Sequence, residues 1–250
     1  MRGFMKNLYI NGCSFTAGDR LGLQKPDKIW PKLLSDRLDT NLINHSENGS
    51  SMQTITFNSV NYLSTLNSED TLVVIGLTWE PRYMVQVGEG VVNVTPAIVQ
   101  PGRDRSVSFG RIQFPYIAKD ETRLEWKTKS NTKRTELFTE DKYPVKILDD
   151  FSKYYNSLIK YDYNLEENQK LNLITNIVYL QSYLKQKNFK YKFIDFGSVD
   201  YTFNLPIINE LDKENIILIK NTPYRRNHPR HPTEKECIEI SKEIYDSINR

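Results

Sequence analysis

The chain has 250 residues, and its 34 Lys+Arg against 31 Asp+Glu give a formal net charge of +3. This length allows one or two domains, and the near balance of charge gives no reason to expect a nucleic-acid partner. No apolar run approaches the roughly 20 residues that cross a bilayer, and the apolar region of a secretory signal peptide is missing after Arg2 and Lys6. With only two cysteines, a reducing compartment fits best, so we expect a cytoplasmic protein with no membrane partner.

Short apolar runs alternate with helical spacing over the first 80 residues. The runs at 8–10, 41–44 and 71–76 predict short strands, two of them buried and ended by a glycine. Apolar residues at helical spacing over 30–38 and 50–63 predict helices between them. This alternation favours a parallel sheet with helices on both faces, a three-layer α/β fold.

The middle of the chain changes character. From 83 to 145, glycines and prolines separate short pieces that contain Val and Ile, and helical periodicity is absent, which predicts a β-rich or irregular insertion. Within it, 127–134 is dense in Lys, Thr and Arg; this stretch fits either a solvated loop or a contact with a partner or polyanion. We otherwise expect 1–250 to form a single domain.

Helical spacing returns in the last third of the chain. It predicts helices around 151–158 and 171–184, while 191–196 and 216–219 predict strands. A final helix is expected over 233–248. Its first residue, Thr233, has Glu236 three positions later, which is the spacing of a capping box.

Ligands of open parallel sheets gather beyond the carboxyl ends of the strands. A serine on a tight strand-to-helix turn can expose its hydroxyl there, with its own N–H pointing into the same pocket, and Ser14 has this place after the first strand. Such a serine needs a base. Only His45, His228 and His231 are available, and His231 lies just before the last helix.

Four short motifs at these strand and helix ends carry a family resemblance. The order and spacing of Gly-Cys-Ser-Phe-Thr at 12–16, Gly49, Gly-Leu-Thr at 76–78 and His-Pro-Thr at 231–233 resemble the SGNH (GDSL-type) hydrolase superfamily. The resemblance is to variants of phage or bacterial type whose first block is Gly-Cys-Ser-Phe-Thr. It spans 7–249 without the insertion and implies a flavodoxin-like sheet.

The resemblance also implies an activity and its residues. Family members hydrolyse esters or acetyl groups on lipids, carbohydrates and other small molecules, and we expect neither a cofactor nor a metal. Ser14 would be the nucleophile and His231 the general base. The backbone N–H groups of Ser14 and Gly49 would be two donors of the oxyanion hole.

The sequence departs from the family at three positions: Cys13 replaces an Asp, Thr78 an Asn, and His228 the Asp of the closing Asp-x-x-His. A Thr hydroxyl can donate one hydrogen bond, so Thr78 is predicted as the third oxyanion donor. A backbone carbonyl or an acid from another loop would orient His231, with Glu80 as the candidate acid.

Several neighbouring residues have two interpretations. Arg82 is either a salt-bridge partner within its loop or a clamp on the substrate. The segment 224–231 holds three Arg and two His, among them His228, which fits either a solvated loop or recognition of an anionic substrate. Cys13 fits packing against the sheet better than a role as nucleophile. No spacing rule supports a metal site made of Cys13, His228 and His231.

Two hypotheses from different classes follow. The first is a serine esterase or deacetylase that acts on an acyl ester of a carbohydrate or another small molecule. The second is a catalytically degenerate SGNH-fold module with a structural or binding role, for example in a phage particle, whose protein partner would contact the 83–145 insertion. A nucleotide-binding flavodoxin-like domain is a weaker third, because a Gly-rich phosphate loop is missing.

Overall fold

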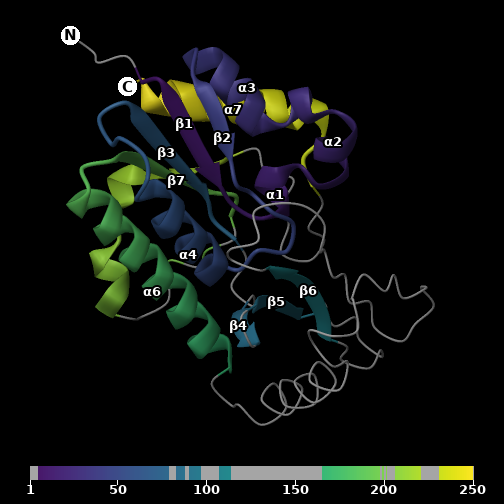
Figure 1. The fold of residues 1–250 in the computed structure, drawn as a ribbon, viewed down its shortest axis with the longest axis vertical. Coiled ribbons are helices and arrows are strands. Elements are labelled where there is room, and N and C mark those ends of the chain that lie inside the picture. Colours follow the sequence, from purple (N-terminus) through teal and green to yellow (C-terminus); the bar gives the residue numbers. More distant parts are fainter. Residues whose placement is uncertain are drawn as a thin grey trace.

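The computed structural model describes residues 5–78, 165–197, 199, 201, 206–220 and 231–249, together with the backbone of three strands between 83 and 113. Its main sheet has five strands in the order β2-β1-β3-β7-β8, and every neighbouring pair is parallel (Figure 1). The strands are β1 (Asn7–Asn11), β2 (Asn41–Asn44), β3 (Thr71–Gly76), β7 (Lys190–Asp195) and β8 (Ile216–Leu218).

The strand order fixes the fold class. The chain starts at β1, adds β2 on one side, and then crosses over to add β3, β7 and β8 on the other side. This is the order 2-1-3-4-5 of flavodoxin-like sheets, which have a switch point between the first and third strands. The prediction of a flavodoxin-like α/β fold is therefore confirmed, and the switch point lies at the end of β1.

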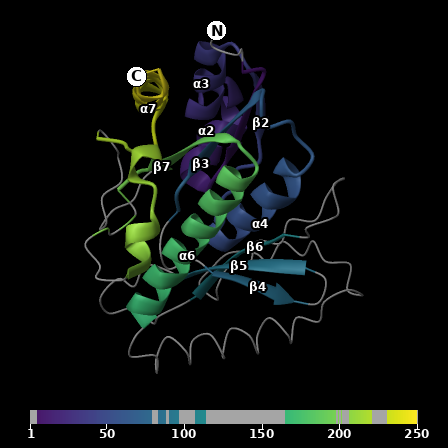
Figure 2. The same ribbon diagram turned by 90° about the vertical axis from the view of Figure 1, so that its left-hand side faces the viewer.

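Helices cover both faces of the sheet, as Figure 2 shows from the side. One face carries α3 (Trp30–Leu38) and α7 (Glu234–Ile248), and the other carries α4 (Met52–Leu63) and α6 (Leu165–Gln186). Side chains alternate along a strand. Leu8 and Ile10 therefore pack with α3 and α7, whereas Tyr9 packs with α4 and α6.

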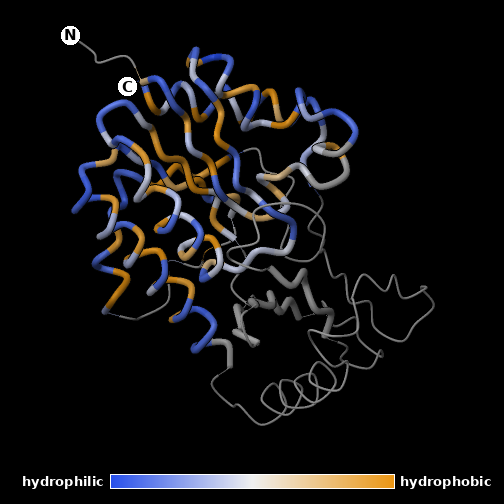
Figure 3. Tube along the Cα trace, in the orientation of Figure 1, coloured by the Kyte–Doolittle hydropathy of each residue, from blue (hydrophilic) through white to orange (hydrophobic). Residues whose placement is uncertain are grey.

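The central strands are buried on both sides. All six residues of β3 are buried, which explains why its sequence is a continuous apolar run rather than an alternating one. In Figure 3 the apolar segments follow the sheet and the inner faces of the helices, and the polar segments lie outside. Two apolar clusters, one on each side of the sheet, make up the core.

A second, antiparallel sheet of three strands follows β3 in sequence. Its order is β4-β5-β6, with bounds Tyr83–Val87, Gly90–Pro96 and Val107–Gln113. It lies beyond the carboxyl edge of the main sheet, and β4 lies beside α4 (Figures 1 and 2). The boundaries 83–145 of an inserted subregion stay a prediction, because most of these residues lie outside the described part of the chain.

Within the described residues, the predicted strands and long helices are present, with small shifts at their ends. The helix expected from 171 already begins at Leu165, and the one expected around 151–158 lies outside the described residues. Short elements that the periodicity did not predict are α1 (Ser14–Ala17), α2 (Asp19–Gln24), and the 3₁₀ helices η1 (Pro26–Lys28), η2 (Pro206–Glu210) and η3 (Lys213–Asn215). Within the described ranges, no helix combines the length and apolar composition needed to cross a bilayer.

Candidate active site

The first loop turns directly from strand into helix. After β1, Cys13 is extended (φ −93°, ψ −162°), and α1 begins at Ser14. This one-turn helix ends at Gly18, whose φ of +78° favours a glycine. Ser14, the first residue of α1, follows the carboxyl end of β1 and is only 6% exposed.

Two glycines of the site are explained by one threonine. Thr16 is fully buried, and a β-carbon on either Gly12 or Gly76 would overlap its Oγ1 atom. The side chain of Thr16 thus fills the space between the end of β1 and the end of β3. Glycine at these two positions lets the first and third loops approach closely, which is a packing role separate from any catalytic one.

The second loop joins β2 to α4. Gly49 has φ +82°, which a residue with a side chain rarely adopts. Ser51 caps α4 by accepting a hydrogen bond from the N–H of Thr54 at 3.2 Å. The N–H of Glu47 donates to the carbonyl of Gly12 at 3.1 Å, so the loop that carries Gly49 is fastened to the loop that carries the serine.

The third loop follows β3 and is tied to the second. Thr78 is 1% exposed, and its hydroxyl donates to the carbonyl of Ser50 at 3.0 Å. A hydroxyl has a single hydrogen. The structure therefore places Thr78 beside Ser50, the residue after Gly49. Its role as an oxyanion donor stays a prediction, and it requires that the hydroxyl hydrogen turn away from Ser50.

The structure brings His231 to the first loop from the other end of the chain. Its ring lies against the ring of Phe15, with the centroids 5.3 Å apart and the planes at 42°. Phe15 directly follows Ser14 and is itself held, because its carbonyl accepts a hydrogen bond from the indole of Trp30 at 3.2 Å and its ring lies 5.7 Å from that of Phe196. The partly buried His231 is thus a neighbour of the turn that carries Ser14.

The start of α7 holds His231 in place. Thr233 and Glu236 form the predicted capping box, in which the N–H of Thr233 donates to the Glu236 carboxylate at 2.8 Å. Glu234, the first residue of α7, forms an ion pair with Lys25 at 3.0 Å. Cys237, in the next turn, is 1% exposed and lies in the core. The helix start is therefore anchored both to the core and to the segment after α2.

Another histidine of the described chain has a different environment. His45, after β2, packs edge-on against Tyr62 with ring centroids 4.1 Å apart, and burial lowers its pKa. The predicted residues Glu80, Arg82 and His228 lie outside the described residues, so their roles stay predictions. Within the described ranges, no group of His, Cys, Asp and Glu is arranged to hold a metal ion.

A buried carboxylate lies at the same edge, and the sequence analysis missed it. Asp195 ends β7, is fully buried, and accepts a hydrogen bond from the N–H of Gly197 at 2.9 Å. It lies beside Tyr201, whose phenol pKa is raised by burial and further by the negative charge of Asp195. An acid at the end of the strand predicted over 191–196 was the available signal.

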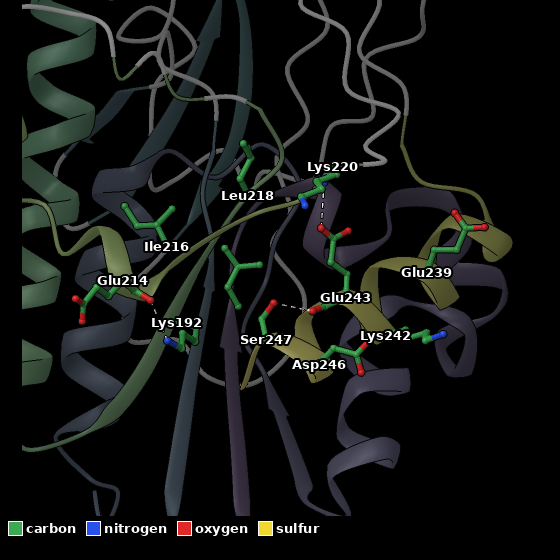
Figure 4. Close-up of a pocket in the computed structure, with 11 residues that line it drawn as sticks. Lys192, Glu214, Ile216, Leu218, Lys220, Glu239, Lys242, Glu243, Asp246 and Ser247 are labelled. Atoms are coloured by element: carbon green, nitrogen blue, oxygen red, sulfur yellow. Dashed lines mark hydrogen bonds between the residues drawn. The ribbon is translucent and has the colours of Figure 1, made fainter. Parts of the chain in front are cut away.

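A groove on the flank of the molecule is unrelated to this site. It has a volume of about 610 Å³ and lies between β8 and α7 (Figure 4). Its lining mixes charges of both signs, for example Lys220, Lys242, Glu239 and Asp246, with the apolar Leu218. None of the predicted catalytic residues lines it.

No protein-family model and no curated protein matches the chain. Among solved structures, it is similar to the psychrotrophic esterase EstA from Pseudoalteromonas sp. at 14% identity, 98% of this chain and 97% of that chain, and a TM-score of 0.44. A member of the lipolytic protein G-D-S-L family from Veillonella parvula matches at 11% identity, 98% and 99% coverage, and a TM-score of 0.45. TesA matches at 11% identity, 97% and 98% coverage, and a TM-score of 0.45.

The strand order shows the fold class, and contacts at the carboxyl edge of the sheet define the candidate site. Ser14, Gly49 and Thr78 lie on three loops joined by hydrogen bonds, and His231 joins them through Phe15. Sequence reasoning missed the packing contacts that hold these residues in place. The burial of Thr16 between two glycines and the contact of Phe15 with the histidine have no periodic signature in the sequence.

Proposed function

We propose that the chain is a serine hydrolase of the SGNH type that cleaves a small acyl ester. The observation that supports this most is the contact of the His231 ring with Phe15, the residue next to Ser14. A candidate base from the end of the chain then lies at the turn that presents a candidate nucleophile from its beginning. Covalent catalysis needs a base next to its nucleophile, and the proposal assigns that place to His231.

In the proposed reaction the Ser14 Oγ attacks the ester carbonyl while the His231 imidazole takes the hydroxyl proton. The N–H groups of Ser14 and Gly49 donate to the oxyanion of the tetrahedral intermediate. The imidazolium then gives its proton to the departing alkoxide, which leaves an acyl-serine. Water attacks this ester with His231 again as base, and the acid is released with Ser14 restored.

Thr78 is proposed as a third donor that acts only after its hydroxyl turns. In the free site the Thr78 hydroxyl donates its hydrogen to the Ser50 carbonyl. The two backbone donors need no such change, so they carry most of the stabilisation in this proposal.

The substrate class within this proposal rests on the family resemblance of the four sequence blocks. We propose an acyl group on a carbohydrate or on another small molecule. For the acceptor that orients His231, we retain Glu80 or a backbone carbonyl. Glu80→Gln should then lower the esterase rate and leave the melting temperature nearly unchanged, and full turnover in this variant would exclude the Glu80 carboxylate.

A fluorophosphonate probe tests the nucleophile, because it labels an activated serine covalently. Wild type should be labelled, and both Ser14→Ala and His231→Ala should lose the label. Cys13→Ala is the matched control beside the serine and should keep it. Labelling of Ser14→Ala at the wild-type rate, or an unlabelled wild type that hydrolyses no small ester, would overturn the proposal and favour the binding-module hypothesis.

A further inference from the structure

Asn11, the last residue of β1, makes more hydrogen bonds than its place in a strand requires. Its side chain is 1% exposed. The Oδ1 atom accepts the N–H of Gly12 at 2.8 Å, and Nδ2 lies 3.2 Å from the carbonyl of Ile55, 3.1 Å from Ser59 Oγ and 3.3 Å from Tyr9 Oη. A carboxamide is the one side chain that can both accept on one side and donate two hydrogens on the other.

The directions of these bonds are fixed by their neighbours. Burial raises the pKa of Tyr9 to about 12, so its phenol is protonated and donates to Ser59 Oγ at 3.2 Å. The phenol oxygen is then left to accept from Asn11. The carbonyl of Ile55 can only accept, which requires the NH₂ group of Asn11 to face α4 and its oxygen to face Gly12.

These bonds connect the two loops that carry the proposed oxyanion donors. Gly12 is held at both its polar atoms, with its N–H on Asn11 and its carbonyl on the N–H of Glu47. On the other side, Asn11 holds the first two turns of α4, the helix that starts just after Gly49. The carboxamide therefore joins the serine turn to α4, the helix that follows the Gly49 turn.

We propose that Asn11 is a positioning residue that sets the separation of the Ser14 and Gly49 N–H groups. It touches no reacting atom and acts through Gly12 on one side and α4 on the other. This inference rests on the proposed serine hydrolysis for its catalytic consequence. Displacement of catalytic groups by about 1 Å costs on the order of 100-fold in rate. Loss of a rigid link between the two donors should therefore lower kcat measurably.

Asn11→Asp is the sharpest test because it removes the NH₂ donor, keeps the shape and the acceptor, and makes the position ionisable. The carboxylate keeps the acceptor for Gly12 but places an oxygen against the carbonyl of Ile55. Burial and this carbonyl raise the pKa of the new acid, and its protonated form can donate again. The titratable groups around it are the Tyr9 phenol and, against the Tyr9 ring, His45 and Tyr62.

We expect kcat of Asn11→Asp to fall about 10- to 100-fold at pH 8 with KM within about twofold of wild type. The ratio of variant to wild-type kcat should rise as the pH is lowered towards 5, because protonation restores the donor. Dividing by wild type removes the loss caused by protonation of His231. A ratio that stays flat with pH, or a wild-type kcat, would overturn the proposal.

Ser59→Ala is the matched control on the helix side. It removes one acceptor of the network and leaves the bonds of Asn11 to Gly12 and Ile55 in place. Its kcat should stay within about twofold of wild type, whatever its stability. A loss as large as that of Asn11→Asp would show that the whole network, and not the link through Asn11, matters for the rate.

A readout without turnover separates this inference from the proposed function. Amide hydrogen exchange over 12–18 should be faster in Asn11→Asp than in wild type at pH 8, with exchange over 190–195 in β7 unchanged. If wild type hydrolyses no ester, the proposed function fails and unchanged exchange over 12–18 would still overturn the role of Asn11. If Asn11→Asp does not fold at pH 8, Asn11→Ala and the protonated Asn11→Asp at pH 5 take its place.

Discussion

Thr16 shows how a single side chain decides which residues its neighbours can be. Because its Oγ1 occupies the space where a β-carbon of Gly76 would lie, Gly76→Ala should lower the free energy of unfolding by about 1–3 kcal/mol. Thr16→Ala in the same chain should return most of that loss, since the remaining distance from the new β-carbon to Thr16 Cβ is 3.4 Å. Urea denaturation of the single and double variants measures the coupling.

Gly12 supplies the control for this cycle. A β-carbon there would also come within 2.7 Å of Thr16 Cβ and 3.1 Å of the Gly76 carbonyl, so removal of Oγ1 does not clear the space. Thr16→Ala should therefore fail to rescue Gly12→Ala. Additive losses in both pairs would contradict the packing described at the ends of β1 and β3.

The hydroxyl of Thr78 donates a hydrogen bond to the Ser50 carbonyl in the free site. This bond limits the loss of kcat that we expect when the hydroxyl is removed. Removal of a full oxyanion donor costs about 100- to 1,000-fold in kcat. Because the Thr78 hydroxyl must first leave the Ser50 carbonyl, Thr78→Val should lower kcat by only about 10-fold, with a loss of stability of about 1 kcal/mol from the broken bond. Steady-state kinetics and thermal melting test both parts.

A larger loss in Thr78→Val would mean that the hydroxyl serves the oxyanion fully in the reacting site. Thr78→Ser keeps the hydroxyl and is the conservative comparison. It should retain most of the wild-type kcat in either case.

At the scale of elements, Asp212 links α6, β7 and η3. Its carboxylate receives hydrogen bonds from Tyr191 at 2.8 Å and Asn215 at 3.0 Å and pairs with Lys185 at 2.9 Å. Partial burial acts to raise its pKa, but the bonds from Lys185, Asn215 and Tyr191 prevail and lower it to about 2. The ionised form therefore stabilises the junction at the amino-edge side of β7.

Because this pKa is lowered from its ordinary value of 3.8, the stabilisation is present above about pH 5 and is lost as the pH falls towards 2. Its size is at most about 2 kcal/mol. Asp212→Asn should lower the free energy of unfolding at pH 7 and flatten its dependence on pH between 5 and 2. Urea denaturation at several pH values measures this dependence. If the free energy of unfolding changed with pH equally in the variant and in wild type, this role of Asp212 would be contradicted.

The same scale shows what the sequence could and could not predict. A parallel strand such as β3 is covered on both faces, so it must be apolar throughout, and that is visible in a single chain. Three of the four segments of the proposed site were located from the ends of predicted strands, and the fourth from the start of the last helix. In contrast, α1 has only one turn and no room for periodicity, and the bonds of Asn11 and Thr78 join residues 28 to 48 positions apart. Their partners are set by the meeting of strands and not by local spacing.

At the scale of the whole molecule, the proposed site depends on both ends of the chain. Ile244 of α7 is fully buried in the cluster that contains Leu8, Trp30 and Cys13. Ile244→Ala should cost about 2–5 kcal/mol of stability while kcat without denaturant stays near wild type, because Ile244 lies in the last turns of α7 and His231 precedes its first.

Ile238 is the control on the same helix, since it is 43% exposed and its change to Ala should alter stability little. Within each of the three proteins, hydrolysis and the circular dichroism signal should disappear at the same urea concentration, which should be lowest for Ile244→Ala. Loss of the circular dichroism signal with retained hydrolysis would mean that the site does not need α7 in place.

The direction of α7 has a practical consequence. Its end at Ile248 and the start of β1 at Asn7 lie on the amino edge of the sheet, whereas Ser14 lies on the carboxyl edge (Figure 1). Ile248 and Met5 pack against the same apolar cluster. A surface tether or fusion attached beside either of these elements would therefore hold the protein by the edge opposite Ser14, and immobilised chains would present the carboxyl edge, with the second sheet beyond it, to the solution.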